Sequence, residues 1–424
     1  MNENRTIRPL TADDMDAWLA ILGNAYPAME MNTRAIQAER AASARENLSH
    51  AADRRWYGLF SGATLLGGMR LFDFEMTLFE QPALVGGVGA VAVDLTRKKE
   101  HVARDLIAYF LRHYRQLGAP LAILYPFRAD FYGAMGFGYG PKQNTYRITP
   151  GALPAHGDRS RVRFLTDEDR PALIELYNAV ASRTHGMIAL SSASAASYLT
   201  QPDLRIVGWF DPASGALRGY LAFTLEIVDK RASFLLQDLI VQELIYADSA
   251  ALLGLLAFLR TQQDQVRAIV LHTLDDAFHY LLSDPRNGYD RPAPHIYHES
   301  NTQGVGLMYR LLDARRFFTA APDHRFGAET LTLRLTIHDS FLPEQDDSLV
   351  VAFTDGIARL QADETPADVD LTLAVGDASA LLMGCVGLRS LYGLGLAEIS
   401  DASAVERLDA LFRAARPPVC LTAF

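Results

Sequence analysis

The sequence predicts an α/β protein built from two copies of one unit and followed by a separate α+β domain. The chain of 424 residues is too long for one ordinary hydrophobic core. A motif near the N-terminus recurs after residue 160, and the rhythm of strands and helices changes after residue 300. We therefore expect domains at residues 1–150, 151–300 and 301–424.

The repeat begins with a strand that leads into a capped helix. Residues 7–14 (IRPLTADD) are matched by residues 162–169 (VRFLTDED). In each copy a threonine, Thr11 or Thr166, stands at the expected start of the helix, with an acidic residue three positions later, as in a capping box. We assign these acidic residues to helix N-termini rather than to catalysis.

Both copies continue with a hairpin, a strand, a helix and a further strand. In the first copy we expect these elements at 56–60, 64–72, 89–93, 101–117 and 121–125. In the second copy we expect them at 205–210, 218–227, 236–241, 247–262 and 268–274. The matching order predicts two domains of the same fold.

The remainder of the chain has a different pattern. A proline-rich segment at 290–294 (DRPAP) is a candidate linker before it. Residues 329–337, 349–354 and 369–375 alternate like half-buried strands, and helices are expected at 377–384 and 402–413. This order predicts an α+β domain.

Charge and cysteine content argue against several classes of protein. The formal net charge of −10 argues against nucleic-acid binding, which needs a basic surface, and it fits either a cationic substrate or simple solubility. Cys385 and Cys420 provide neither a disulfide framework nor the spacing of a metal site, so we expect no metal. Without a signal peptide or a membrane-spanning run, we expect a cytoplasmic protein with no membrane partner.

A candidate anion site lies at residues 91–104 (VAVDLTRKKEHVAR). A strand ends at Val93, a basic loop with Lys98 and Lys99 follows, and a helix begins near Glu100. The helix is expected to end at Gly118 and to carry one apolar stripe, formed by Val102, Leu106, Ile107, Phe110, Leu111, Tyr114 and Leu117. Free backbone N–H groups and the helix dipole favour an anion at such a helix start. Taken alone, the segment is either a pyrophosphate site or a solvated basic turn.

This segment resembles motif A of the GNAT acetyltransferase superfamily, Arg/Gln-x-x-Gly-x-Gly/Ala, here at Lys98, His101 and Ala103. Lysine replaces Arg or Gln, and His101 replaces the first glycine. Residues 131–137 (FYGAMGF) resemble the aromatic-Tyr-x-x-x-Gly-aromatic hallmark of the same superfamily. The resemblance implies that Tyr132 protonates the departing CoA thiolate; the alternative is that Tyr132 is only a core aromatic residue.

The first copy therefore holds the expected site for acetyl-CoA as a co-substrate. The expected cofactor-binding residues are Val91, Ala92, Val93, Lys98, Lys99, Glu100, His101, Val102, Ala103, Arg104, Phe127 and Arg128. In the second copy the equivalent loop at 241–248 is acidic and free of glycine, so we expect no cofactor there and one active site per chain.

The whole chain resembles the Eis (enhanced intracellular survival) family of N-acetyltransferases. The resemblance rests on the domain order and on segments 237–241, 275–278, 281–286 and 306–313. It implies a sterol-carrier-protein-like C-terminal domain, amine acceptors such as aminoglycosides, polyamines or lysine side chains, and a homo-oligomer, specifically a hexamer. It also implies that the terminal carboxylate of Phe424 is the general base; the alternative is an apolar tail packed against the core.

These expectations combine into direct transfer from acetyl-CoA to an amine. Phe424 accepts the amine proton, backbone N–H groups near Val93 polarise the thioester carbonyl, and Tyr132 protonates sulfur. Acceptor-pocket residues are expected around 26–34. Two rival functions are a cofactor-free scaffold and a lipid carrier that uses the C-terminal domain.

Overall fold

The chain forms two compact units. The computed structural model describes residues 5–29, 54–191, 203–229, 236–287 and 297–424, with a few single positions between these ranges. Unit 1 combines Met1–Gly140 with Leu307–Phe424, and unit 2 is Pro141–Gly306. The candidate linker at 290–294 lies outside the described residues.

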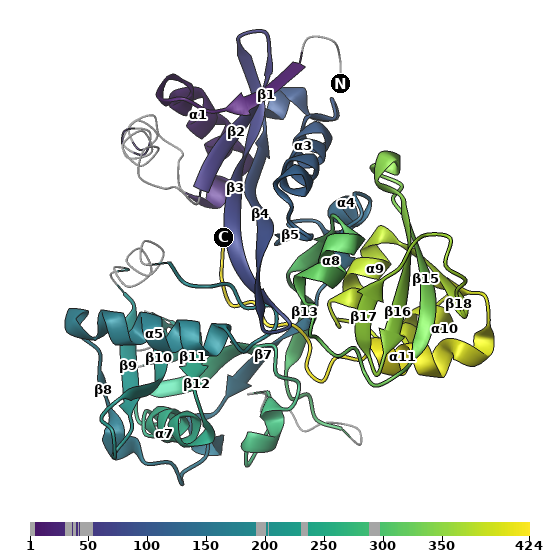
Figure 1. Ribbon diagram of the computed structural model, residues 1–424. Helices are drawn as coiled ribbons and strands as arrows, with labels where there is room; N and C mark the ends of the chain where they lie inside the picture. The colour runs from purple at the N-terminus through teal and green to yellow at the C-terminus, as the bar shows by residue number, and fades with distance from the viewer. Residues whose placement is uncertain are drawn as a thin grey trace. The chain divides into compact units, whose positions relative to one another are not determined.

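Unit 1 begins with a mixed sheet in the order β1-β2-β3-β4-β5-β14-β6, of which Figure 1 labels β1 to β5. Its strands are β1 (Arg5–Pro9), β2 (Arg54–Ser61), β3 (Thr64–Leu78), β4 (Gln81–Val93), β5 (Leu121–Leu124), β6 (Gly138–Tyr139) and β14 (Met308–Leu311). Helices α1 (Met15–Ala25) and α3 (Val102–Leu117) pack on this sheet. Strand β14 lies beyond residue 301, yet it pairs with both β5 and β6.

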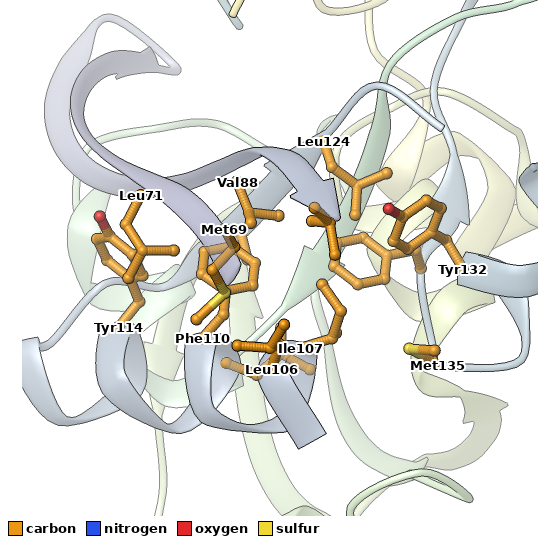
Figure 2. Close-up of a cluster of buried hydrophobic side chains, with 14 of the residues drawn as sticks. Met69, Leu71, Val88, Leu106, Ile107, Phe110, Tyr114, Leu124, Tyr132 and Met135 are labelled. Carbon is orange, nitrogen blue, oxygen red and sulfur yellow. The ribbon is translucent and has the colours of Figure 1, made fainter. Parts of the chain in front are cut away.

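Helix α3 carries the apolar stripe that the sequence predicted. Val102, Leu106, Ile107, Phe110, Leu111 and Tyr114 are all buried. Figure 2 shows several of them packed against Met69, Leu71 and Val88 from β3 and β4. Leu117, which we also placed on the stripe, is 49% exposed, because the helix ends there in the left-handed cap at Gly118.

Strands β3 and β4 form a long hairpin that the sequence did not predict, because we expected these strands only at 64–72 and 89–93. Its turn residues, Phe79 and Glu80, have φ values of 49° and 69°. The Phe79 ring stacks on His324 with 3.8 Å between centroids and meets the edges of Phe317 and Phe326. Packing against the C-terminal domain therefore stabilises a turn that lacks the usual Asn-Gly signal.

The C-terminal domain is an α+β fold around a sheet in the order β17-β16-β15-β18-β19. Its strands are β15 (Leu331–His338), β16 (Asp347–Thr354), β17 (Ile357–Leu360), β18 (Val369–Ala374) and β19 (Ala397–Ile399). Its helices are α8 (Ala314–Ala320), α9 (Val375–Leu382), α10 (Leu388–Gly393) and α11 (Val405–Phe412). Phe317, Phe318, Phe326, Phe353 and Phe412 form an aromatic cluster in its interior.

A buried ion pair joins the C-terminal domain to the first domain within unit 1. Arg310 on β14 and Asp339 after β15 are 0% and 1% exposed at their side chains and lie 2.5 Å apart. The Arg310 Nε also donates to the carbonyl oxygen of Met135 at 2.9 Å. The guanidinium is thus paired on both sides, as a buried charge requires.

Unit 2 repeats the fold of the first domain, with a sheet in the order β13-β7-β12-β11-β10-β9-β8. Its strands are β7 (Lys142–Ile148), β8 (Val162–Phe164), β9 (Arg205–Phe210), β10 (Leu217–Ile227), β11 (Gln237–Tyr246), β12 (Val266–Thr273) and β13 (Thr302–Val305). Its helices include α5 (Arg170–Ala181) and α7 (Ser249–Arg260). Strands β7 and β13 come from outside residues 151–300: β7 pairs with β12, and β13 pairs with β7 at the edge of the sheet.

The internal repeat is confirmed in detail at the start of each copy. Thr11 with Asp14, and Thr166 with Asp169, both form capping boxes. In the first copy Arg8 pairs with Asp14 at 2.7 Å and lies over the ring of Phe60. Arg163 makes the same two kinds of contact in the second copy, with Asp169 and with Phe210.

The second copy differs where the first has its basic loop. We predicted a loop at 241–248, but β11 continues to Tyr246 and Asp248 already caps α7. The strand continues because Leu244 and Ile245 extend the ladder with β10 past a bulge at Gln242. Ala247 alone connects the end of β11 to Asp248, so this connection contains no basic loop that could bind a pyrophosphate.

The bulge in β11 places a carboxyl group, Glu243, at a partly buried position in unit 2. Tyr220 donates a hydrogen bond to it, and burial raises its pKa to about 7. An acid with a raised pKa keeps its proton in the folded state after the unfolded chain has lost it, so stability falls as pH rises from 4.5 to 7.

Glu243→Gln is therefore expected to stabilise the protein above pH 7 by about 2–3 kcal/mol and to have little effect below pH 4.5. Chemical unfolding of both proteins across pH 4 to 8 measures the difference. Glu226→Gln, at an exposed position on β10, is the control and should show no such trend. A pH-independent effect of Glu243→Gln would contradict the prediction.

Among the described residues, no helix combines the length and hydropathy that a membrane span requires.

Candidate active site

The candidate site of the first domain begins where β4 separates from β5. Their parallel ladder ends at Gly87 and Ile123, so the rest of β4 has no pairing with β5. A bulge follows, since Arg70 pairs with Gly89 but Gly68 pairs with Ala92. Ala90 in the bulge has a φ of 48°. This opening leaves backbone groups of β4 available to a ligand.

The loop between β4 and α3, residues 94–101, leads to a helix start whose backbone N–H groups lie near the same opening. Asp94 caps the first turn by accepting a hydrogen bond from the Thr96 backbone N–H at 2.8 Å. The Asp105 N–H donates to the His101 carbonyl oxygen at 2.9 Å, which is the first bond of α3. The N–H groups of 102–104 precede that bond, so they remain available at the positive end of the helix dipole.

A cavity of about 920 Å³ lies along this strand, loop and helix start. All of the predicted cofactor-binding residues except Glu100 line it. The Glu100 carboxylate instead pairs with Arg5 at 3.3 Å and with Arg97 at 3.6 Å, because its position at the end of the loop turns it away from the cavity. Sequence reasoning did not find the contributions of Leu95, Phe131, Met135, Ser340 and Phe341 to the lining.

The cavity has a basic rim. Within the part of the chain that the structure describes, Lys98, Lys99 and Arg104 make no ion pair, whereas Arg128 pairs with Asp130. Three cations without acidic partners beside a helix N-terminus favour a polyanionic ligand. Among the described residues, no group of three or more His, Cys, Asp or Glu side chains is arranged to hold a metal ion.

His101 is the residue that departs from the glycine of motif A. Its backbone is left-handed, with φ 62° and ψ 13°, and its side chain is exposed. Glycine adopts this conformation without strain, and histidine tolerates it better than most residues. The position therefore requires a left-handed backbone conformation rather than glycine itself. Because the His101 imidazole is exposed, it does not obstruct the loop.

Because the left-handed conformation penalises a Cβ, His101→Gly is expected to be more stable than His101→Ala by about 1 kcal/mol. Both variants remove the imidazole, so the comparison isolates the backbone. Chemical unfolding of the two variants measures the difference. Equal midpoints, or a less stable glycine variant, would show that the loop does not need this conformation.

Tyr132 lies on α4 (Ala129–Gly133) with only 3% of its surface exposed. Its ring meets the edges of Phe127 and Phe131, which line the cavity, and Figure 2 shows it at the end of the core cluster near Leu124. Burial, with a smaller contribution from Tyr26, raises the pKa of Tyr132 well above its usual value. The phenol therefore carries its proton at neutral pH.

The backbone after Tyr132 adopts a conformation that requires the glycine of the hallmark, Gly136. Gly136 has a φ of 80°, and a Cβ there would lie 2.6 Å from a side-chain atom of Val375. Its neighbour Phe137 donates its backbone N–H to the Tyr132 carbonyl oxygen at 3.2 Å. The glycine thus lets the chain reverse directly after α4 and fixes the tyrosine beside the cavity.

The C-terminal tail packs against the hairpin β3–β4, and Figure 1 marks the C-terminus there. The ring of Phe424 lies 5.3 Å from Phe72, 4.9 Å from Phe74 and 5.2 Å from Tyr125, measured between centroids. The Tyr125 hydroxyl donates to the Thr422 carbonyl oxygen at 3.2 Å. Three aromatic contacts and a hydrogen bond hold the tail to the first domain.

The terminal carboxylate of Phe424 lies against Gly89 of β4. A Cβ on Gly89 would be 3.3 Å from the carboxyl carbon and 3.4 Å from its oxygen. Gly89 is two positions before Val91, whose carbonyl oxygen accepts a hydrogen bond from Tyr26 at 2.8 Å. Phe424 is not itself among the cavity-lining residues, but it meets the strand that forms one wall.

The expected acceptor segment at 26–34 is described only in part. Tyr26 lines the cavity, and Pro27–Met29 form a short 3-10 turn. Residues 30–34 lie outside the described residues.

Family profiles match three successive parts of the chain. Residues 6–140 match an acetyltransferase (GNAT) domain, residues 190–311 match a further acetyltransferase (GNAT) domain, and residues 309–421 match a sterol carrier protein domain. The predicted fold class is thereby confirmed: tandem GNAT domains precede a sterol-carrier-protein-like domain. The chain is an N-acetyltransferase.

Individual relatives match the chain over nearly its whole length. The chain is 24% identical to an uncharacterized N-acetyltransferase of Streptomyces griseus, covering 99% of both chains. A GCN5-related N-acetyltransferase from Kribbella flavida has a similar structure, with a TM-score of 0.77, 20% identity and coverage of 99% and 98%. Eis1 from Mycobacterium abscessus gives 0.75, with 19% identity and coverage of 99% and 100%. These structures share the fold.

Proposed function

We propose that the first GNAT domain transfers an acetyl group from acetyl-CoA to a primary amine, and that the protein is a member of the Eis family. The observation that carries the proposal is the cavity of about 920 Å³, whose basic rim meets the N-terminus of α3 beside the open half of β4. The structural similarity to Eis1, over nearly all of both chains, supports the family assignment.

The basic rim would hold the pyrophosphate of the co-substrate. Lys98 and Lys99 supply charge, and the N–H groups of 102–104 supply hydrogen bonds. The pantetheine arm would then follow the unpaired part of β4, which places the thioester carbonyl near the backbone N–H groups around Val93.

The two ends of the site would supply the acid and the base. The ammonium substrate gives a proton to the Phe424 carboxylate, directly or through water, and the neutral nitrogen attacks the thioester carbonyl. The C–N bond forms, the C–S bond breaks, Tyr132 gives its proton to the sulfur, and the new amide nitrogen loses its second proton to solvent. Solvent then restores the proton of Tyr132 and removes the proton from Phe424.

The acceptor class follows from charge and from the family resemblance. A chain with a net charge of −10 attracts cationic amines, so we propose aminoglycosides, polyamines or lysine side chains as acceptors. On the resemblance to Eis we further propose a cytoplasmic homo-oligomer, specifically a hexamer. No nucleic acid or membrane partner is part of this proposal.

The rival functions have less support. A cofactor-free scaffold would have no use for a basic rim whose cations lack acidic partners among the described residues. A lipid carrier would need an apolar hollow in the C-terminal domain, and Phe317, Phe318 and Phe353 fill its interior instead.

The direct test is acetyl-CoA with a panel of amines, read as release of free CoA thiol. With the best amine, Tyr132→Phe is expected to lower kcat by about 10²–10³-fold while acetyl-CoA still binds, because the ring remains and only the proton is lost. Tyr139→Phe, at a tyrosine that is 52% exposed, is the control and should behave as the wild type. Failure of every amine, or an unchanged kcat in Tyr132→Phe, would contradict the proposal.

A further inference from the structure

A second cavity, of about 660 Å³, runs along the outer face of α3. It shares His101, Arg104 and Phe341 with the first cavity. From these residues it continues past Ala108 to Gln116, and Phe341 and Leu342 of the C-terminal domain contribute to its wall. The shared residues therefore line both cavities, beside the start of α3.

The second cavity combines flat rings with cationic groups. The Arg104 guanidinium lies 5.3 Å from the centre of the Phe341 ring, and the Tyr109 ring stacks on His113 at 5.7 Å. The Nε2 of His113 is buried without a hydrogen-bond partner among the described residues. The acidic groups in the lining are already paired, since Arg5 binds both Glu100 and Asp105. Such a lining suits an aromatic base that carries a phosphate.

Phe341 is held in place by the buried ion pair. The backbone N–H groups of Phe341 and Leu342 donate to Asp339 Oδ1 at 3.0 and 2.9 Å. Asp339 in turn pairs with Arg310, and both side chains are buried. The C-terminal domain thus presents Phe341 to the first domain from a loop whose backbone is fixed.

We propose that the second cavity binds the 3′-phosphoadenosine end of acyl-CoA, with the adenine ring against Phe341 and the 3′-phosphate beside Arg104. This inference rests on the proposed function, which sets the pyrophosphate at the start of α3 and the pantetheine along β4. The 3′-phosphoadenosine end of acyl-CoA must therefore extend from the pyrophosphate in a direction away from the pantetheine. His101, Arg104 and Phe341, which line both cavities, lie beside the start of α3, and Tyr109 and His113 line the second cavity further along α3.

The test compares acetyl-CoA with S-acetyl-pantetheine, which lacks the nucleotide, as acyl donors. Phe341→Ala is expected to raise the KM for acetyl-CoA by about 10-fold and to leave the KM for S-acetyl-pantetheine unchanged, because a stacked ring is worth roughly 1–3 kcal/mol. Phe341→Trp keeps a stacking surface and should restore the KM for acetyl-CoA. A KM does not depend on the fraction of protein that is folded, so partial unfolding would not imitate this result.

Arg104→Gln gives an independent test at an exposed position, where folding is not at risk. The wild type should prefer acetyl-CoA to its 3′-dephospho form by about 10-fold, and this preference should disappear in the variant. Equal KM changes for both donors in Phe341→Ala, or a preference that survives Arg104→Gln, would overturn the second-cavity assignment while the proposed transferase remains. A wild type that uses neither donor would overturn both.

Discussion

Residues appended after Phe424 are expected to lower kcat by about 10²–10⁴-fold while acetyl-CoA still binds, because they turn the proposed base into a neutral amide. The carboxylate lies against β4 at Gly89, where a Cβ would come within 3.3 Å of the carboxyl carbon. An added residue would move the new terminus away from this position. Steady-state rates of thiol release and calorimetric titration with acetyl-CoA separate the loss of catalysis from a loss of binding.

The matched controls distinguish the carboxylate from the aromatic ring. Phe424→Leu keeps a terminal carboxylate on an apolar side chain and should retain most of the activity, with a weaker hold on the tail. The same residues added before Met1 should change nothing. Full turnover by the C-terminally extended protein would show that the tail only packs against Phe72 and Phe74.

Asp339→Asn is expected to destabilise unit 1 by about 3–5 kcal/mol, because it leaves the Arg310 guanidinium buried without a counter-charge. Both side chains are essentially inaccessible to water, so neither solvent nor salt can compensate. The midpoint of chemical unfolding measures the loss. The pair also connects Met135, beside the first cavity, with the loop of Phe341, so the KM for acetyl-CoA should rise as well.

The control for this prediction is a solvent-exposed ion pair in the same region. Arg112 and Glu344 lie 2.5 Å apart, with 45% and 54% of their side chains exposed. Glu344→Gln should change stability by less than about 1 kcal/mol, since solvent screens an exposed pair. Similar effects in Asp339→Asn and Glu344→Gln would mean that burial of the first pair has no energetic consequence.

Local patterns predicted the parts of the fold that depend on neighbours in sequence. The stripe on α3, the capping boxes at Thr11 and Thr166, and the end of β4 at Val93 all follow from short-range spacing, and the structure confirms them. The family hallmark pointed to Tyr132, and the structure packs that side chain against Phe127 and Phe131, which line the cavity.

Features that depend on distant contacts were not predictable in this way. The turn at Phe79 and Glu80 exists because His324 and Phe326 pack on Phe79. No periodicity in β14 indicates that it joins the sheet of the first domain. Ser340 and Phe341 line the cavity although they lie more than 200 positions beyond the first-domain residues of the lining. The buried ion pair between Arg310 and Asp339 holds their loop in place, and no local pattern in the sequence reveals that pair.

The central claim is that the first GNAT domain of each chain holds one acyl-CoA, and that the second holds none. Calorimetric titration of the full-length protein with acetyl-CoA measures this directly as a stoichiometry. We predict one equivalent per chain, because the loop of unit 2 is reduced to a short connection between Tyr246 and Asp248. Absence of binding, or two equivalents per chain, would contradict the account.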